Sequence, residues 1–152
     1  VIGYGRVGTE LARVLRERGV PVLVIDDSSH HVERAHAAGI PAIRGNAAAD
    51  LVLAEAQPDK AKIAVLAIPQ PLEAGEVLVK LRAINPALTL LARAHSDFEV
   101  KYLLEHGARV DARNKLGIHL ERTRTYPVER GTLLAGSVAC YLHRKLATDE
   151  HR

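Results

Sequence analysis

The chain opens with Val1-Ile2-Gly3-Tyr4-Gly5-Arg6-Val7-Gly8. This stretch has the pattern of a buried strand that ends in a glycine turn and runs on into a helix, G-x-G-x-x-G. In such a pattern the first glycine allows a tight turn and the second lets a pyrophosphate approach bare main chain. The third lets the helix pack close to the strand, and the helix directs its free N–H groups at the phosphate. The stretch therefore predicts a phosphate-binding turn.

The residues that follow the turn support this prediction. Apolar residues recur at helical spacing as far as Leu15, and Gly19 is placed to end that helix. The run Val22–Ile25 is apolar throughout, as is typical of a fully buried parallel strand. Asp26 follows 18 positions after Gly8, close to where a dinucleotide fold places the carboxylate that binds a ribose. This order favours a nucleotide site over a strand–helix–strand unit whose turn is merely tight.

The same alternation continues along the chain and predicts the fold class. Further helices are expected at 30–38, 50–56, 72–84 and 97–106, and further strands at 40–43, 63–68 and 88–94. Ser28 and Ser29 are expected to cap the second helix, and Ser96 and Asp97 the last one. Val77, Leu78, Leu81 and Ile84 are expected to form the buried face of the helix at 72–84. The pattern predicts an α/β protein, a Rossmann-like doubly wound parallel sheet in a single domain, followed by a poorly patterned C-terminal tail.

In such a sheet the carboxyl ends of all the strands lie on one edge, where ligands bind. The glycine turn, Asp26, Asn46, Pro69 and Arg93 would all reach that edge. Arg93 ends an otherwise apolar strand, and a cation in that position needs an anion, either a phosphate or the carboxylate of a partner.

Composition excludes several classes of function. Residues 1–108 carry 12 Lys and Arg against 13 Asp and Glu, whereas residues 109–152 carry 9 against 5. The net charge of +3 therefore comes from the tail, which argues against a nucleic-acid-binding face on the folded part. Aromatic residues make up only 3% of the chain, which argues against a stacking platform for single strands. The single cysteine, Cys140, excludes an internal disulfide framework.

The chain shows no signal peptide and no apolar run long enough to cross a bilayer. It begins inside a strand, and we therefore expect it to be incomplete at its start, which leaves room for a membrane segment upstream.

Several motifs taken together resemble one family. They are the glycine turn, the run to Asp26, Gly45-Asn46-Ala47, Glu73-Ala74-Gly75-Glu76 and Ala92-Arg93-Ala94-His95. Residues 1–108 resemble the nucleotide-binding N-terminal half of the domains that regulate potassium conductance (RCK, KTN or TrkA-N domains), in particular the cytoplasmic domain of bacterial cation:proton antiporters of the potassium-efflux type. The resemblance implies a domain that binds NAD(H) or AMP/ADP, pairs as a homodimer and catalyses nothing. It would control the membrane antiporter domain of the same polypeptide at the cytoplasmic face of the bacterial inner membrane, without binding nucleic acid.

The resemblance also assigns roles to particular residues. Main-chain contacts to the phosphates would come from Gly3, Tyr4, Gly5, Arg6 and Val7, with Gly8 completing the turn. Asp26, with Asp27 beside it, would hold the ribose hydroxyls, Asn46 and Ala47 would lie near the adenine, and Arg93 would close the site. Two adjacent carboxylates argue against a 2′-phosphate, which needs a cation at that place. NAD(H) or AMP/ADP is therefore favoured over NADP.

The tail departs from the family pattern. Family members usually continue with an apolar sixth strand and a helix that crosses to the partner subunit, but residues 109–115 are too polar to predict a strand. Leu133–Leu146 could form a helix, although small residues weaken it. Residues 1–108 are therefore expected to be the nucleotide-binding domain, and residues 109–152 an extension that is either a dimer-crossing helix or disordered.

Other residues of the chain suggest functions different from nucleotide sensing. Tyr141 and Lys145 have the Y-x-x-x-K spacing that short-chain dehydrogenases use for proton transfer, so an NAD-dependent oxidoreductase fragment is the alternative function. A DNA-binding repressor would need a basic recognition helix, and the sequence offers none. His30, His31 and His36 lie close together in the sequence and raise the question of a metal site. His30, however, has no ligand partner at the i+3 or i+4 spacing of a helix, and no cysteine supports such a site. The three histidines are therefore interpreted as solvated or capping residues.

Overall fold

The computed structural model describes residues 1–94 and 96–108. Four short strands run parallel in two pairs, β1 (Val24–Asp26) with β2 (Ala42–Arg44) and β3 (Ile63–Leu66) with β4 (Thr89–Ala92). Isolated parallel bridges from Ile2 to Ile25 and to Leu66 join the pairs. The order across the sheet is β2, β1, the Ile2 segment, β3 and β4. This is the order of a dinucleotide-binding half, with the first segment of the chain at its centre.

Hydrogen bonds on both sides fix the central segment. The Ile2 N–H donates to the Val65 carbonyl at 2.8 Å, and the Ala67 N–H donates to the Ile2 carbonyl at 2.7 Å. On the other side the Gly3 N–H donates to the Ile25 carbonyl at 2.8 Å. The glycine turn therefore starts from the middle of the sheet, at the level where β1 and β3 end.

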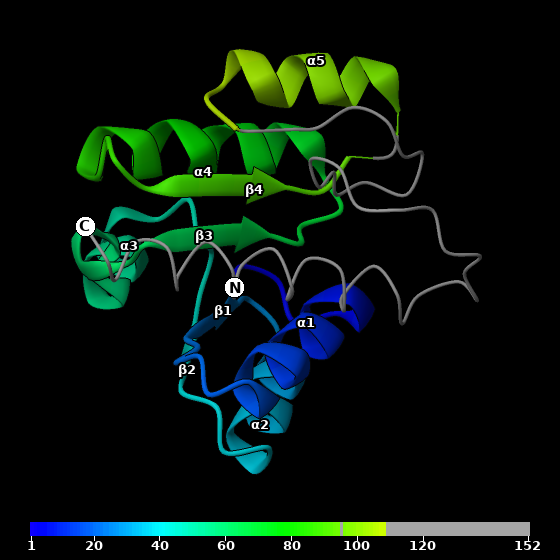
Figure 1. Cartoon of the computed structure of the whole chain (residues 1–152), viewed down its shortest axis with the longest axis vertical. Coiled ribbons are helices and arrows are strands. Elements are labelled where there is room, and N and C mark those ends of the chain that lie inside the picture. The colour runs from blue at the N-terminus through cyan, green and yellow to red at the C-terminus, as the bar shows by residue number, and fades with distance from the viewer. Residues whose placement is uncertain (95, 109–152) are drawn as a thin grey trace.

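Helices cover both faces of the sheet, which explains why successive residues of a strand, on both faces, are apolar and buried. Val24, Val65 and Leu91 face α1 (Arg6–Glu17) and α2 (Ser29–Ala37), whereas Ile25, Leu66 and Leu90 face the opposite core. That core is completed by α3 (Asp50–Ala56), α4 (Pro71–Ile84) and α5 (Asp97–Glu105). Figure 1 shows α1 and α2 together below the pair β3–β4, and α4 and α5 together above it.

The predicted elements are present, with shifted ends. Ser28 and Ser96 cap α2 and α5 by accepting the N–H groups of His31 and Glu99, as expected. The first helix begins at Arg6 and so includes Gly8, because the turn itself supplies the first helical residues. Pro71, expected to lie between strand and helix, is the first residue of α4, where its missing N–H costs nothing. A short 3₁₀ turn, η1 (Pro58–Lys60), precedes β3.

One core prediction is wrong. Val77, Leu78 and Leu81 of α4 are buried, but Ile84 is 44% exposed because it lies in the last turn of the helix, at the end of the face that packs on the sheet.

Close packing of α4 against α5 depends on Gly75. A Cβ atom on Gly75 would lie 2.6 Å from the Tyr102 ring, so a larger residue would force the Tyr102 side chain to move. None of the helices in residues 1–94 and 96–108 is long and apolar enough to cross a membrane. The predictions made for His95 and for residues 109–152, including Cys140, Tyr141, Lys145 and the helix at Leu133–Leu146, fall outside the described residues.

Candidate functional site

The glycine turn leaves the start of α1 open. Gly3 has a φ of +93°, which only glycine adopts without strain. Gly5 is the N-cap of α1 and makes no side-chain cap bond, and the first turn of the helix contains no acidic residue. The first N–H groups of an α-helix have no partner within the helix. The turn thus presents free main-chain donors and the positive end of the helix dipole.

Gly5 and Gly8 differ in what surrounds them. A Cβ atom on Gly5 would meet nothing within 4 Å, so a group that approaches from outside can reach the main chain here. A Cβ atom on Gly8 would overlap the Gly3 carbonyl group, 2.8 Å from its carbon atom. Gly5 therefore keeps a surface open, whereas Gly8 allows the turn to close.

Tyr4 and Val7 contribute to the turn from inside. The Tyr4 side chain is only 2% exposed and packs with Ala12 and Val24. Its main-chain N–H donates to Asp26 Oδ2 at 2.6 Å and is therefore not free to donate to a phosphate in this arrangement. Val7 is half-buried against the α1 side of the core. The free donors of the turn are left to Gly5 and the residues after it.

Asp26 lies beside the turn with a carboxylate that is almost fully engaged. It is 9% exposed, and Oδ1 accepts the Ser28 N–H at 2.9 Å while Oδ2 accepts the Tyr4 N–H. His31 Nδ1 lies 3.0 Å from Oδ1. Asp26 thus ties the end of β1 to the glycine turn and to the start of α2. Asp27, next to it, is exposed.

His31 is the site residue that the sequence interpretation missed. It was expected to be a solvated or capping residue, but its ring is about one-third exposed and contacts Asp26. The signal was present only indirectly, because Ser28 caps α2 and so places the first turn of that helix over the carboxylate. No group of three or more His, Cys, Asp or Glu side chains among the described residues is arranged to hold a metal ion.

The loop after β2 joins the same edge. The Gly45 N–H donates to the Asp26 carbonyl at 3.0 Å, which places the neighbouring Asn46 and Ala47 next to the end of β1. Asn46 is exposed, but its Oδ1 accepts the Ala48 N–H at 2.7 Å and so shapes the loop. Ala47 is buried, with only 4% of its surface exposed.

Two arginines give the other end of this edge a positive charge. Arg6 is exposed at the start of α1, and Arg93 follows β4 with its main-chain N–H donating to the Leu66 carbonyl at 3.0 Å. Burial lowers the pKa of Arg93, Arg6 lowers it further by repulsion, and Glu99 partly opposes the change. Arg6 therefore adds to the positive potential at Arg93, and an anion near Arg93 would be favoured.

Glu73, in the first turn of α4, adds a carboxylate to the surroundings of Asp26 and Asp27. Burial raises the pKa of the Glu73 carboxyl, and the charges of Asp27, Glu76 and Asp26 raise it further. The charges of Asp26, Asp27 and Glu73 therefore act on one another beside the glycine turn.

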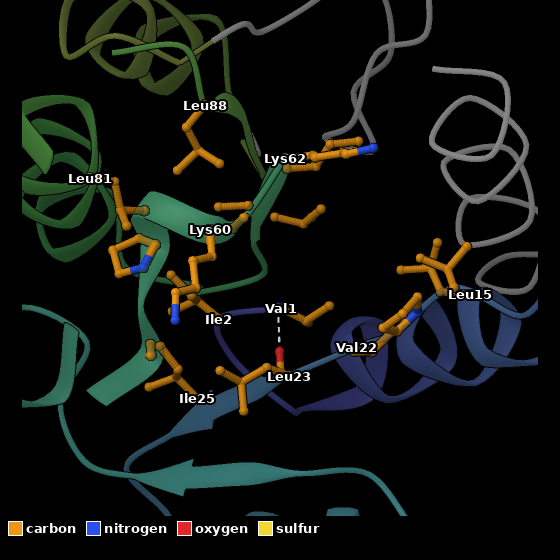
Figure 2. Close-up of a pocket in the computed structure, with 18 of the residues that line it drawn as sticks. Val1, Ile2, Leu15, Val22, Leu23, Ile25, Lys60, Lys62, Leu81 and Leu88 are labelled. Atoms are coloured by element: carbon orange, nitrogen blue, oxygen red, sulfur yellow. Dashed lines mark hydrogen bonds between the residues drawn. The ribbon is translucent and has the colours of Figure 1, made fainter. Parts of the chain in front are cut away.

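A separate cavity of about 600 Å³ lies at the amino-terminal edge of the sheet, and no residue from Gly3 to Gly8 lines it. Figure 2 shows its wall, with Val1, Val22 and Leu23 on one side and Lys62 and Leu88 on another, and the Val1 nitrogen donating to the Leu23 carbonyl at 2.8 Å. No predicted site residue lines this cavity. It is therefore not part of the candidate site.

Comparison with known proteins found similarity over most of the described chain. A family model, the TrkA-N domain, matches residues 1–112. The chain is 41% identical over 108 residues to YbaL, a candidate cation/proton antiporter of Escherichia coli (strain K12), and this match covers 71% of the chain and 19% of YbaL. It is 28% identical over 94 residues to the glutathione-regulated potassium-efflux system protein KefC of Klebsiella pneumoniae, covering 62% of the chain and 15% of KefC. The chain thus spans less than a fifth of the length of either relative.

Solved structures agree with this result. The TrkA-N domain of the E. coli inner membrane protein YbaL matches with a TM-score of 0.68 over 70% of this chain and 79% of that one. The Kef C-terminal domain of Shewanella denitrificans in its AMP-bound form is 27% identical, with a TM-score of 0.62 over 70% of this chain and 63% of that one. The GsuK channel bound to NAD shares the fold, with a TM-score of 0.64 at 17% identity over 70% of this chain and 19% of that one.

Proposed function

Because this chain belongs to the TrkA-N domain family, a family of regulatory domains related to potassium-efflux antiporters and channels, we propose that it senses a nucleotide. It binds NAD(H) or AMP/ADP and thereby controls a monovalent cation:proton antiporter or another potassium transport system. The single observation that carries the proposal is the open glycine turn beside a carboxylate: nothing fills the space at Gly5, and the Tyr4 N–H joins the turn to Asp26 at 2.6 Å. An adenine nucleotide has the matching polarity, with anionic phosphates for the turn and, next to them, a ribose whose hydroxyls can donate to the carboxylate.

The pose follows from this polarity. Phosphates lie against the main chain of the turn, Gly3 to Gly8, with Gly5 as the point of closest approach because nothing fills the space beside it. Arg6 and Arg93 neutralise the phosphate charge, and Asp26 accepts a ribose hydroxyl. Asn46 and Ala47, which follow the β2 end beside Asp26, border the adenine. Asp27 and Glu73 would repel a 2′-phosphate, which favours NAD(H) or AMP/ADP over NADP.

Regulation needs a partner whose state the nucleotide can bias. We place the domain on the cytoplasmic face of a bacterial inner membrane, joined to an antiporter domain in the same polypeptide. Two facts about YbaL support this: the chain covers only a small share of it, and it is an inner membrane protein. Residues 1–108 act as the nucleotide-binding unit, and residues 109–152 serve as the extension. A nucleotide shifts the transporter only by as much as its affinities for the two states differ.

Pairing as a homodimer completes the proposal. Large apolar side chains that are exposed among the described residues gather on α4 and α5, which pack together. They are Leu72, Val79, Ile84, Phe98 and Leu104, with only Leu51 elsewhere, on α3. A second copy that covers this face would bury Phe98, now 77% exposed. In light scattering Phe98→Glu should shift a dimer to monomer, whereas Leu51→Glu, at a residue that is 86% exposed but on α3, should not. A Phe98→Glu variant that remains dimeric would rule out this face.

Calorimetry with NADH, NAD, AMP, ADP and NADPH tests the nucleotide proposal. We expect binding of one or more of the first four, and weaker binding of NADPH because of its 2′-phosphate. If calorimetry detects no binding of these nucleotides at saturating concentration, the proposal is overturned. Turnover of NADH with a panel of carbonyl substrates, lost in Tyr141→Phe, would instead favour the oxidoreductase alternative.

A further inference from the structure

Asp26 has little accepting capacity left. An ionised carboxylate offers about four acceptor positions on its two oxygens. Oδ1 accepts from the Ser28 N–H at 2.9 Å and from His31 Nδ1 at 3.0 Å, and Oδ2 accepts from the Tyr4 N–H at 2.6 Å. One position therefore remains, and it is on Oδ2, the oxygen nearer the glycine turn.

His31 is the one side chain among the described partners of Asp26, and the other two are main-chain groups. Because an ionised carboxylate only accepts hydrogen bonds, Nδ1 of His31 carries the hydrogen in this pair. The main chain that carries the ring is positioned by the N-cap of α2, where the His31 N–H donates to Ser28 Oγ at 3.4 Å. His31 therefore fills the second position on Oδ1 and helps the two main-chain N–H groups to hold the carboxylate.

We propose that His31 positions Asp26 so that Oδ2 alone accepts a ribose hydroxyl, which makes the site read one of the two hydroxyls of the adenosine ribose. The inference rests on the proposed nucleotide function. A carboxylate with both oxygens open would bind the 2′- and 3′-hydroxyls as a pair. Here Oδ1 is saturated from inside, so the second hydroxyl receives no bond from Asp26.

Affinities for AMP, 2′-deoxy-AMP and 3′-deoxy-AMP, measured by calorimetry on the whole chain, test the inference. In the wild type one deoxynucleotide should bind about tenfold more weakly than AMP, the scale of a lost hydrogen bond to a charged group, and the other should bind like AMP. His31→Ala should weaken AMP binding by several-fold, up to about tenfold, because Oδ1 keeps only the Ser28 N–H and the carboxylate is held less firmly. It should leave unchanged the affinity for the deoxynucleotide that lacks the Asp26-bound hydroxyl.

Two variants separate positioning from a general structural effect. His31→Asn places an amide N–H near the position of Nδ1 and should restore AMP binding to within about twofold. His30→Ala, a change at the exposed neighbouring histidine, should have no effect. Thermal unfolding without nucleotide checks that each variant folds. If His31→Ala does not fold, the comparison of the two deoxynucleotides in the wild type still tests the inference.

The possible failures are distinguishable. No AMP binding by the wild type would overturn the proposed function and this inference with it. Binding by the wild type with equal losses for both deoxynucleotides, or equal weakening of all three ligands by His31→Ala, would overturn the inference alone.

Discussion

Gly8 and Gly3 touch across the glycine turn, so that a Cβ atom on Gly8 would lie 2.8 Å from the Gly3 carbonyl carbon and overlap its oxygen. The first and third glycines of the motif are therefore one packing unit, and they join the centre of the sheet to α1. The second glycine, Gly5, lies between them without any neighbour that a side chain would meet. The three glycines thus divide into two that build the fold and one that keeps a surface open.

This division predicts opposite outcomes for two similar substitutions. Gly8→Ala should destabilise the domain by about 3 kcal/mol or more, because neither backbone can move without disturbing the sheet or the helix. Gly5→Ala should cost at most about 1 kcal/mol, the difference between these residues at an N-cap. Urea unfolding followed by circular dichroism measures both. Equal losses for the two variants would contradict the assignment.

Gly5→Val carries the test to the ligand. The backbone at Gly5 is extended, with a φ of −73° and a ψ of −157°, which valine also adopts. The variant should fold, but its side chain would occupy the space proposed for the phosphates. Calorimetry should detect no NADH or AMP binding. If the folded variant binds as tightly as the wild type, the phosphates lie elsewhere.

Asp26→Asn should weaken both binding and folding. The asparagine amide has only one oxygen that can accept, so either the Tyr4 N–H or the donors at Ser28 and His31 lose their acceptor. An unsatisfied buried donor costs about 1–3 kcal/mol, and loss of the ribose bond should cost a similar amount in binding. Urea unfolding and calorimetry separate the two effects. Asp27→Asn is the matched control for stability, because Asp27 is exposed; a fold unaffected by Asp26→Asn would show that the three bonds contribute little.

Arg93→Gln should lower the affinity for phosphorylated ligands in particular. Loss of a charged hydrogen bond to phosphate should weaken AMP binding by about 1.5–3 kcal/mol and reduce its dependence on salt. Adenosine, which carries no phosphate, should bind the variant and the wild type alike. Arg44→Gln, a change at an exposed arginine in β2, is the control. A parallel loss of adenosine binding would mean that Arg93 shapes the fold and not the phosphate site.

Glu73 predicts a pH dependence of stability. Its pKa is raised in the folded chain above the ordinary value of 4.5, so the folded state binds this proton more tightly than the unfolded state does. The contribution to stability is therefore fully present below about pH 4.5 and is lost as pH rises through the folded pKa. Glu73→Gln should raise the free energy of unfolding at pH 7 and leave it unchanged at pH 4. Urea unfolding at both pH values measures this, and a gain at pH 4 as large as at pH 7 would contradict it.

The succession of helices and strands could be predicted from the sequence because the physical signals are local. Gly19 and Gly39 follow the ends of α1 and α2 with positive φ, and Ser28 and Ser96 cap helices. The apolar runs of β3 and β4 are long enough to indicate strands buried on both faces. The family, too, could be recognised from the sequence, since its motifs are short and in order.

The candidate site was harder to predict wherever the role of a residue depends on a contact with another residue. The contact between His31 and Asp26 was not expected, although only five residues separate them, because it depends on how the Ser28 cap orients the first turn of α2. Tyr4 was assigned to the phosphates, yet its N–H is committed to the same carboxylate. The exposure of Ile84 depends on where α4 leaves the sheet, and a helical period cannot locate that point.

The sequence by itself determined which segments form strands and helices and that their polar ends share one edge, because periodicity, caps and glycine conformations are properties of neighbouring residues. Only the tertiary structure decided how that edge is charged and which of its groups are already occupied. The charge of Arg6 acts on Arg93, and Asp26 contacts Tyr4, across long separations in the chain. Such contacts depend on how the helices pack on the sheet, and packing is set by the whole core.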